Sequence, residues 1–266
     1  MCKTILFAVL TLCAFSVWGT PLKVDSRNSA RIIGGASARA GQFPFIASIY
    51  INRADGTFFC SGALINSQWV LTAGQCVEGA TLFTIYLGSN SPRGDSENGV
   101  TLATDTYYLH PEYNPATLEN DIGLIKFRTY ITQTDYIRSI NYLASTKLPD
   151  YATVATMGWG QTGDDIPGPV DALNYIYLTT LSNVECRLTF GSQITDNMVC
   201  VAGSYNQGTC LGDSGSPLIQ YGASGNAYHV GISSFYSGNG CETPDPSGFT
   251  RTQPYNQWIS NTTTFG

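Results

Sequence analysis

The sequence has little charge and almost no histidine. Lysine, arginine, aspartate and glutamate make up 12% of the 266 residues, about half of the ~25% typical of soluble domains. Only His110 and His229 carry imidazoles. Low charge together with 28 glycines and 12 prolines excludes coiled coils, long-helix proteins and disordered chains. The formal net charge of −6 argues against nucleic acid as a partner.

Long apolar runs are absent outside the first 20 residues. The segment Ile5–Trp18 is apolar except for Thr11 and Ser16, follows a single lysine and ends at the small Gly19. This pattern predicts a secretory signal peptide over residues 1–19. A membrane anchor is the alternative, but the run is shorter than the ~18 residues expected of a spanning helix. We therefore expect a secreted, extracellular protein without a membrane partner.

Metal-binding patterns are also missing, because no C-x-x-C occurs and histidine is scarce. No cofactor and no metal are expected. Six cysteines remain beyond the leader, and an even number in a secreted chain predicts disulfides, with fifteen pairings open. They are Cys60, Cys76, Cys186, Cys200, Cys210 and Cys241.

The chain lacks internal repeats and any proline- or serine-rich linker, so we expect one closely packed unit. Short apolar or alternating segments, separated by turn clusters, predict an all-β barrel or sandwich. A single helix is expected near Thr252–Asn261, followed by a polar tail. The expected strands are Phe45–Ile51, Trp69–Thr72, Leu82–Leu87, Ile122–Phe127, Val154–Gly158, Asn174–Leu181, Ser216–Gln220 and His229–Ser234.

Four short motifs occur in a fixed order along the chain. They are RIIGG at Arg31–Gly35, LTAGQC at Leu71–Cys76, NDIGL at Asn120–Leu124 and GDSGSP at Gly212–Pro217. Together they resemble the chymotrypsin-like (S1) serine proteases over residues 32–260. The SFY string at Ser234–Tyr236 looks like the digestive chymotrypsins of insects and crustaceans. The mature chain has no cysteines left for an extra disulfide-bonded regulatory module, which favours a digestive origin, such as a gut or saliva secretion, over a protein of a clotting-type cascade.

The resemblance implies two six-stranded antiparallel β-barrels with the site in the crevice between them, and a short C-terminal helix. It implies a short activation propeptide over residues 20–31 and a peptidase domain over residues 32–266. It also implies the disulfides Cys60–Cys76, Cys186–Cys200 and Cys210–Cys241. Removal of residues 1–31 leaves nine basic against 18 acidic residues, a net charge of −9.

The resemblance assigns the catalytic positions and reveals one departure. Ser214 matches the nucleophile, Asp121 matches the orienting acid, and the N–H groups of Gly212 and Ser214 match the oxyanion hole. Gln75 stands where the family has its histidine. An amide has no titratable nitrogen near neutral pH, so Gln75 cannot take the proton from Ser214. We expect Gln75 to hydrogen-bond Asp121 and Ser214 instead, and we expect both histidines to be ordinary surface or packing residues.

The substrate-binding positions are also carried over from the family. Gly208 and Ser247 match the floor of the primary pocket, and neither is acidic, so a basic side chain would find no counter-charge there. Ser234 and Phe235 match the segment that pairs with bound peptide backbone. Tyr236 falls where the family has a small residue, so it is expected to narrow or close the pocket.

Two processing sites complete the expectations. Cleavage after Arg31 by a trypsin-like activating protease would free the amine of Ile32, which the resemblance pairs with Asp213. The sequence at Asn261 fits an N-glycosylation acceptor on a polar C-terminal tail.

These features predict a secreted serine protease homologue that is catalytically inactive and acts as a binding or regulatory pseudoprotease. Its partner would be a peptide or protein ligand, a protease inhibitor or a partner protease. The alternative is an active or weakly active chymotrypsin-like endopeptidase of digestive type. A structural or storage protein is a third hypothesis, in which changes in the cleft would alter no binding.

Overall fold

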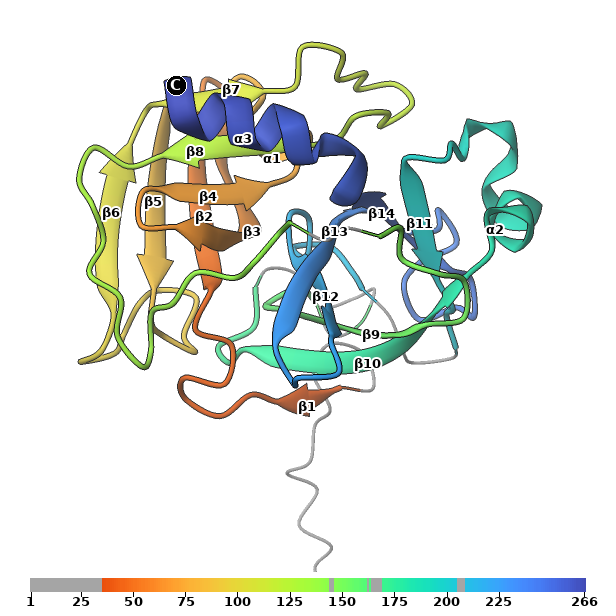
Figure 1. The fold of residues 1–266 in the computed structure, drawn as a ribbon, viewed down its shortest axis with the longest axis horizontal. Coiled ribbons are helices and arrows are strands. Elements are labelled where there is room, and N and C mark those ends of the chain that lie inside the picture. Colours follow the sequence, from red (N-terminus) through yellow and green to blue (C-terminus); the bar gives the residue numbers. More distant parts are fainter. Residues whose placement is uncertain (1–34, 144–145, 162, 164–168, 205–208) are drawn as a thin grey trace, which may run out of the picture.

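The computed structural model describes residues 35–143, 146–161, 163, 169–204 and 209–266. Two antiparallel sheets lie side by side, and the C-terminal helix α3 (Asn256–Phe265) packs across the first of them (Figure 1). The leader, the expected propeptide, Ile32 and Gly208 lie outside the described residues. Within the described part, no helix is long and apolar enough to cross a bilayer.

The first sheet is a curled body of seven strands from the N-terminal half. Its order is β6-β5-β2-β3-β4-β8-β7, with the long hairpin of β2 and β3 at its centre. A four-residue helix, α1 (Gly74–Val77), connects β4 to β5 and carries Gln75. The strands are β2 (Ile46–Arg53), β3 (Gly56–Asn66), β4 (Trp69–Thr72), β5 (Leu82–Leu87), β6 (Val100–Thr104), β7 (Tyr107–Leu109) and β8 (Gly123–Lys126).

The second sheet closes on itself, because β9 pairs with both β12 and β10. Six strands form this barrel in the order β10-β11-β14-β13-β12-β9, and the short β1 adds to β10 at its edge. The strands are β1 (Ala36–Ser37), β9 (Thr153–Gly158), β10 (Asn174–Leu181), β11 (Met198–Val201), β12 (Pro217–Tyr221), β13 (Ala227–Phe235) and β14 (Ser247–Arg251).

Besides α3, one helix and two 3-10 turns lie outside the strands in the described second half of the chain. The helix α2 (Asn183–Phe190) begins with a capping box, in which Ser182 and Glu185 satisfy each other's backbone N–H groups. It runs into the 3-10 turn η1 (Gly191–Gln193), and a second turn, η2 (Gln253–Tyr255), leads into α3.

All three expected disulfides are present. Cys60–Cys76 joins β3 to α1, Cys186–Cys200 joins α2 to β11, and Cys210–Cys241 joins two loops of the second half. They close loops of 16, 14 and 31 residues. Each is expected to stabilise the fold by about 2–4 kcal/mol.

The all-β architecture with a short C-terminal helix is confirmed. The expectation of a single helix was wrong, because α1 and α2 are helical as well. The expected polar tail after the C-terminal helix was also wrong. The helix continues to Phe265, so Asn261 lies in its exposed last turns and not on a polar tail. The helix persists there because its apolar face, through Ile259 and Trp258, packs on the first sheet's core.

Candidate functional site

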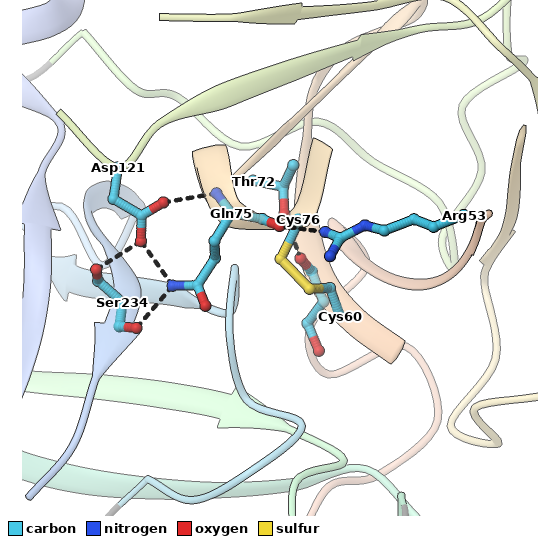
Figure 2. Close-up of a disulfide and its surroundings, with 8 residues drawn as sticks. Arg53, Cys60, Thr72, Gln75, Cys76, Asp121 and Ser234 are labelled. Carbon is cyan, nitrogen blue, oxygen red and sulfur yellow. Dashed lines mark hydrogen bonds between the residues drawn. A yellow bond between two sulfur atoms is a disulfide. The ribbon is translucent and has the colours of Figure 1, made fainter. Parts of the chain in front are cut away.

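The carboxylate of Asp121 is the buried centre of the site. It lies just before β8, is fully buried, and accepts hydrogen bonds from the Gln75 backbone N–H (2.8 Å), the Gln75 Nε2 (2.7 Å) and the Ser234 Oγ (2.5 Å). Figure 2 shows these three contacts converging on it from α1 and β13. Burial raises the pKa of Asp121, because desolvation outweighs these hydrogen bonds.

Both hydrogens of the Gln75 amide are engaged. Its Nε2 donates to Asp121 Oδ2 and, at 2.8 Å, to the Ser234 carbonyl. The expected bond to Asp121 is therefore present, whereas the expected bond to Ser214 is absent among the described contacts. Ser234 takes that place because its carbonyl lies beside the carboxylate, where it receives the second hydrogen. The remaining Oε1 is an acceptor with negligible basicity.

The turn that carries Ser214 is held by two glycines with positive φ. Gly212 has φ 93° and Gly215 has φ 82°, backbone conformations that residues other than glycine rarely adopt. A Cβ on Gly215 would lie 2.2 Å from the Ser61 carbonyl oxygen. The Ser214 carbonyl accepts from the Ser61 N–H at 2.9 Å, which ties the turn to β3.

Three donor groups of this turn, the N–H groups of Gly212 and Ser214 and the Ser214 hydroxyl, have no protein partners among the described residues. Neither the N–H of Gly212 nor that of Ser214 reaches a backbone acceptor, and no side chain of the described chain bonds the Ser214 hydroxyl. An oxyanion hole requires backbone N–H donors that are free to bond the oxygen of a ligand. That the N–H groups of Gly212 and Ser214 form such a hole stays a prediction.

Neither histidine contacts Ser214 in the described structure. The Nδ1 of His229 lies 2.8 Å from the Thr252 Oγ1 in a fully buried site, and burial lowers its pKa to about 3. His110 packs against the rings of Tyr255 and Trp258. Both are packing residues, as expected, so the described site contains no imidazole that could act as its base.

The carboxylate of Asp213 is buried behind the same turn. It accepts from the N–H groups of Gly160 (2.9 Å) and Cys210 (3.0 Å), and burial raises its pKa to about 6. A Cβ on Gly160 would lie 2.3 Å from the Asp213 side chain, so this position must remain glycine. No described cation pairs with Asp213. Its expected partner Ile32, like Arg31, lies outside the described residues.

The expected pocket residues gather at the end of β13. The ring of Phe235 lies on the backbone of Gly248, since a Cβ there would be 2.1 Å from the ring. Ser247 is buried next to it at the start of β14, and Tyr236 packs against the Cys210–Cys241 disulfide. Gly208 is not described, and the narrowing of the pocket by Tyr236 stays a prediction.

Three roles at the site were missed by the motifs. Ser234, expected only to pair with a ligand's backbone, fixes Asp121 through its hydroxyl, and Gly160 supplies a donor to Asp213. Arg53, the last residue of β2, donates from its Nη2 to the Gln75 carbonyl. Only Ser234 lies in a recognisable string. The other two residues are placed by the fold and carry no local signal.

Two β bodies, with Asp121 buried between them and Ser214 on a glycine-framed turn, match the fold of the chymotrypsin-like serine proteases. A model of the trypsin family matches residues 32–259, and the chain belongs to that family.

Curated relatives cover nearly the whole chain. Brachyurin of Leptuca pugilator is 34% identical over 232 residues, which are 87% of this chain and 98% of that protein. A collagenase of Hypoderma lineatum is 32% identical over 268 residues, 98% of each chain. A solved structure described as HL collagenase matches with a TM-score of 0.79 at 31% identity, over 88% of this chain and all of that one.

Proposed function

We propose that this chain is a secreted pseudoprotease, which retains the binding cleft of its family without useful peptidase activity. The observation that carries the proposal is the Gln75 amide, whose two hydrogens are committed to Asp121 and Ser234. The cleft would hold a peptide or protein ligand, a protease inhibitor or a partner protease.

The loss of a base decides the chemistry. A serine hydroxyl becomes an effective nucleophile only when a neighbour takes its proton. An amide oxygen is too weak a base for this task, and no imidazole contacts Ser214 in the described structure. Loss of the histidine from the comparable triad of subtilisin costs about 10⁶-fold in turnover. A rate above that of water by about 10³- to 10⁴-fold can still come from binding and the oxyanion donors.

An active or weakly active chymotrypsin-like endopeptidase is the second candidate. It is favoured by the unengaged N–H groups of Gly212 and Ser214 and by relatives that are named collagenase and serine protease. In that case the missing base would come from the substrate. The pocket residue Ser247 carries no charge, so apolar side chains are the preferred occupants in either case.

Hydrolysis assays separate the two candidates. We expect the mature chain, cut after Arg31, to hydrolyse aromatic and leucine peptide esters at least about 10⁴-fold more slowly than an ordinary protease of this fold. Labelled peptides should nevertheless bind, as measured by fluorescence anisotropy. Hydrolysis at ordinary protease rates that Ser214→Ala abolishes would establish the second candidate instead.

Secretion and activation form part of the proposal. The N-terminal signal pattern and three disulfides support an extracellular location, with gut lumen or saliva as the expected site. A trypsin-like protease would cut after Arg31, and the new ammonium of Ile32 would pair with Asp213. Such a buried pair orders the neighbouring turn, because the carboxylate is otherwise buried without a counter-charge.

This pairing predicts that the free energies of unfolding of the cut and uncut chains differ by an amount that depends on pH. Burial raises the pKa of Asp213 from 3.8 to about 6. In the uncut chain, the stability that protonated Asp213 contributes to the folded state is therefore fully present below pH 4 and is lost as the pH rises through 6. The loss amounts to about 3 kcal/mol. The new ammonium in the cut chain removes this loss. The stability gap in favour of the cut chain should therefore widen from pH 4 to pH 6.

Urea unfolding of both forms across this range measures the gap. His229 has the opposite trend, because its lowered pKa makes stability fall as the pH drops below 6.5, but it contributes equally to both forms. The Asp213→Asn variant is the control, in which the gap should no longer depend on pH. A gap that stays constant in the unmodified protein would contradict the pairing.

A further inference from the structure

The guanidinium of Arg53 lies at the edge of the cleft beside an exposed aromatic ring. It is 4.9 Å from the centre of the Phe58 ring, and Phe58 is 40% exposed. Its Nη2 donates to the Gln75 carbonyl. Figure 2 places Arg53 and the Cys60–Cys76 disulfide on one side of Gln75, and Asp121 and Ser234 on the other.

No carboxylate of the described chain forms an ion pair with Arg53. Arg128 and Arg138, in contrast, pair with Asp105 and Asp135. The Nε of Arg53 is buried without a hydrogen-bond partner, so the charge is partly desolvated. A partly buried cation without a counter-charge is unfavourable, and an incoming carboxylate improves its energy.

The neighbouring acids do not supply this counter-charge. Asp121 is buried behind Gln75 and already accepts three hydrogen bonds. Glu78 is exposed at the end of α1. Burial is the main cause of the raised pKa of Tyr113; the charge of Glu78 raises that pKa further and the charge of Arg53 lowers it. Glu78 nevertheless forms no ion pair with the guanidinium among the described residues.

The path of a bound peptide leads toward Arg53. In the proposed function, Ser234 and Phe235 pair with the peptide segment that precedes the carbonyl in the oxyanion hole. The ring of Phe59 lies 3.8 Å from the Cβ position of Gly212, so it flanks the oxyanion donors. Side chains alternate along a strand, so Phe58 lies on the same face of β3 as Cys60 of the disulfide. A peptide that continues beyond the carbonyl would pass Phe59 and the disulfide and, on the disulfide's face of β3, approach Phe58 and Arg53.

We propose that Arg53 and Phe58 form a subsite for an acidic side chain, located in the peptide segment that follows the carbonyl in the oxyanion hole. The Phe58 ring holds the guanidinium plane from one side, and the bond to Gln75 fixes its rotation, so the remaining donors are preorganised for a carboxylate. This selectivity rests on the proposed peptide binding and adds a preference to it.

Three peptides test the subsite. Each carries an N-terminal fluorophore, a central phenylalanine and an amidated C-terminus, and they differ only in the two residues after phenylalanine: Asp-Asp, Asn-Asn or Lys-Lys. The amide removes any terminal carboxylate as a competing ligand. Anisotropy titrations use the mature chain and the variants Arg53→Ala, Arg53→Lys and Arg53→Glu. Arg128→Ala, at an exposed arginine just after β8, is the matched control.

The mature chain should bind the Asp-Asp peptide about 5- to 10-fold more tightly than the Asn-Asn peptide, a gain between that of an exposed ion pair and that of a buried charged hydrogen bond. Arg53→Ala should abolish this preference, and Arg53→Glu should reverse it toward Lys-Lys. Arg53→Lys should keep only part of it, because an ammonium lacks the planar fork. Arg128→Ala should leave the preference intact, and unfolding curves of the variants should match that of the native chain.

Two outcomes would overturn the subsite, and they are distinguishable. Equal affinity for the three peptides, unchanged by Arg53→Glu, would remove the subsite and leave the binding cleft in place. Absence of binding by every peptide, in a chain that is folded by its unfolding curve, would remove the proposed function and the subsite with it.

Discussion

Replacing Gln75 by histidine should raise the hydrolysis of apolar peptide esters by about 10³-fold or more, because it restores the one missing group. Asp121 already lies 2.7 Å from the Gln75 Nε2, in position to hold the inner N–H of an imidazole. Ser234 supplies a second acceptor at 2.8 Å. The second ring nitrogen would then face the cleft, where the Ser214 hydroxyl has no partner within the described chain. Initial rates on the mature, Arg31-cut protein measure the gain.

Two variants control this experiment. Gln75→Asn offers no base and should leave the rate at the level of the native chain. Ser214→Ala in the Gln75→His background should remove the gain completely. If the rate stays flat while a labelled peptide still binds, the missing base is not the sole defect, and the narrowing of the pocket by Tyr236 becomes the first alternative.

Replacing Asp121 by alanine should lower the free energy of unfolding by about 3 kcal/mol. The substitution leaves three donors without their acceptor: the Gln75 N–H, the Gln75 Nε2 and the Ser234 Oγ. Each unsatisfied buried donor costs about 1–3 kcal/mol. Removal of a carboxylate whose pKa is already raised by burial returns part of that cost. The loss of the hydrogen bonds should nevertheless prevail, and urea unfolding at pH 7 measures the difference.

The matched control is Asp105→Ala, in the connection between β6 and β7. Asp105 is exposed and forms a surface ion pair with Arg128, so its removal should lower the free energy of unfolding far less than Asp121→Ala does. Equal destabilisation by the two substitutions would contradict the view that Asp121 holds Gln75 and Ser234 together.

The sequence predicted those parts of the fold that depend on local patterns. The strands Trp69–Thr72, Leu82–Leu87 and Asn174–Leu181 were predicted with their observed bounds, because turn residues flank compact apolar runs. The central strand β3 was missed, since its residues GTFFCSGALIN mix glycine, serine and aromatic residues without alternation. Its position in the sheet comes from pairing with β2 and β4, which a local pattern does not encode.

The site shows the same division. Motifs located Gln75, Asp121 and Ser214, and the resemblance supplied the disulfide pairs. The bond from Gln75 to the Ser234 carbonyl joins residues 159 positions apart, so only the packed structure reveals it. The contact of Arg53 with Gln75 likewise depends on how the hairpin of β2 and β3 approaches α1.

The N–H groups of Gly212 and Ser214, which no described backbone acceptor engages, have a consequence for mixtures of related proteins. An inhibitor that inserts a peptide carbonyl between these donors needs no proton transfer, so a chain without a base remains a competent receptor for it. If the proposed function holds and such a chain is secreted beside complete proteases, it would act as a decoy. It would sequester the shared inhibitor and thereby protect its active relatives from inactivation.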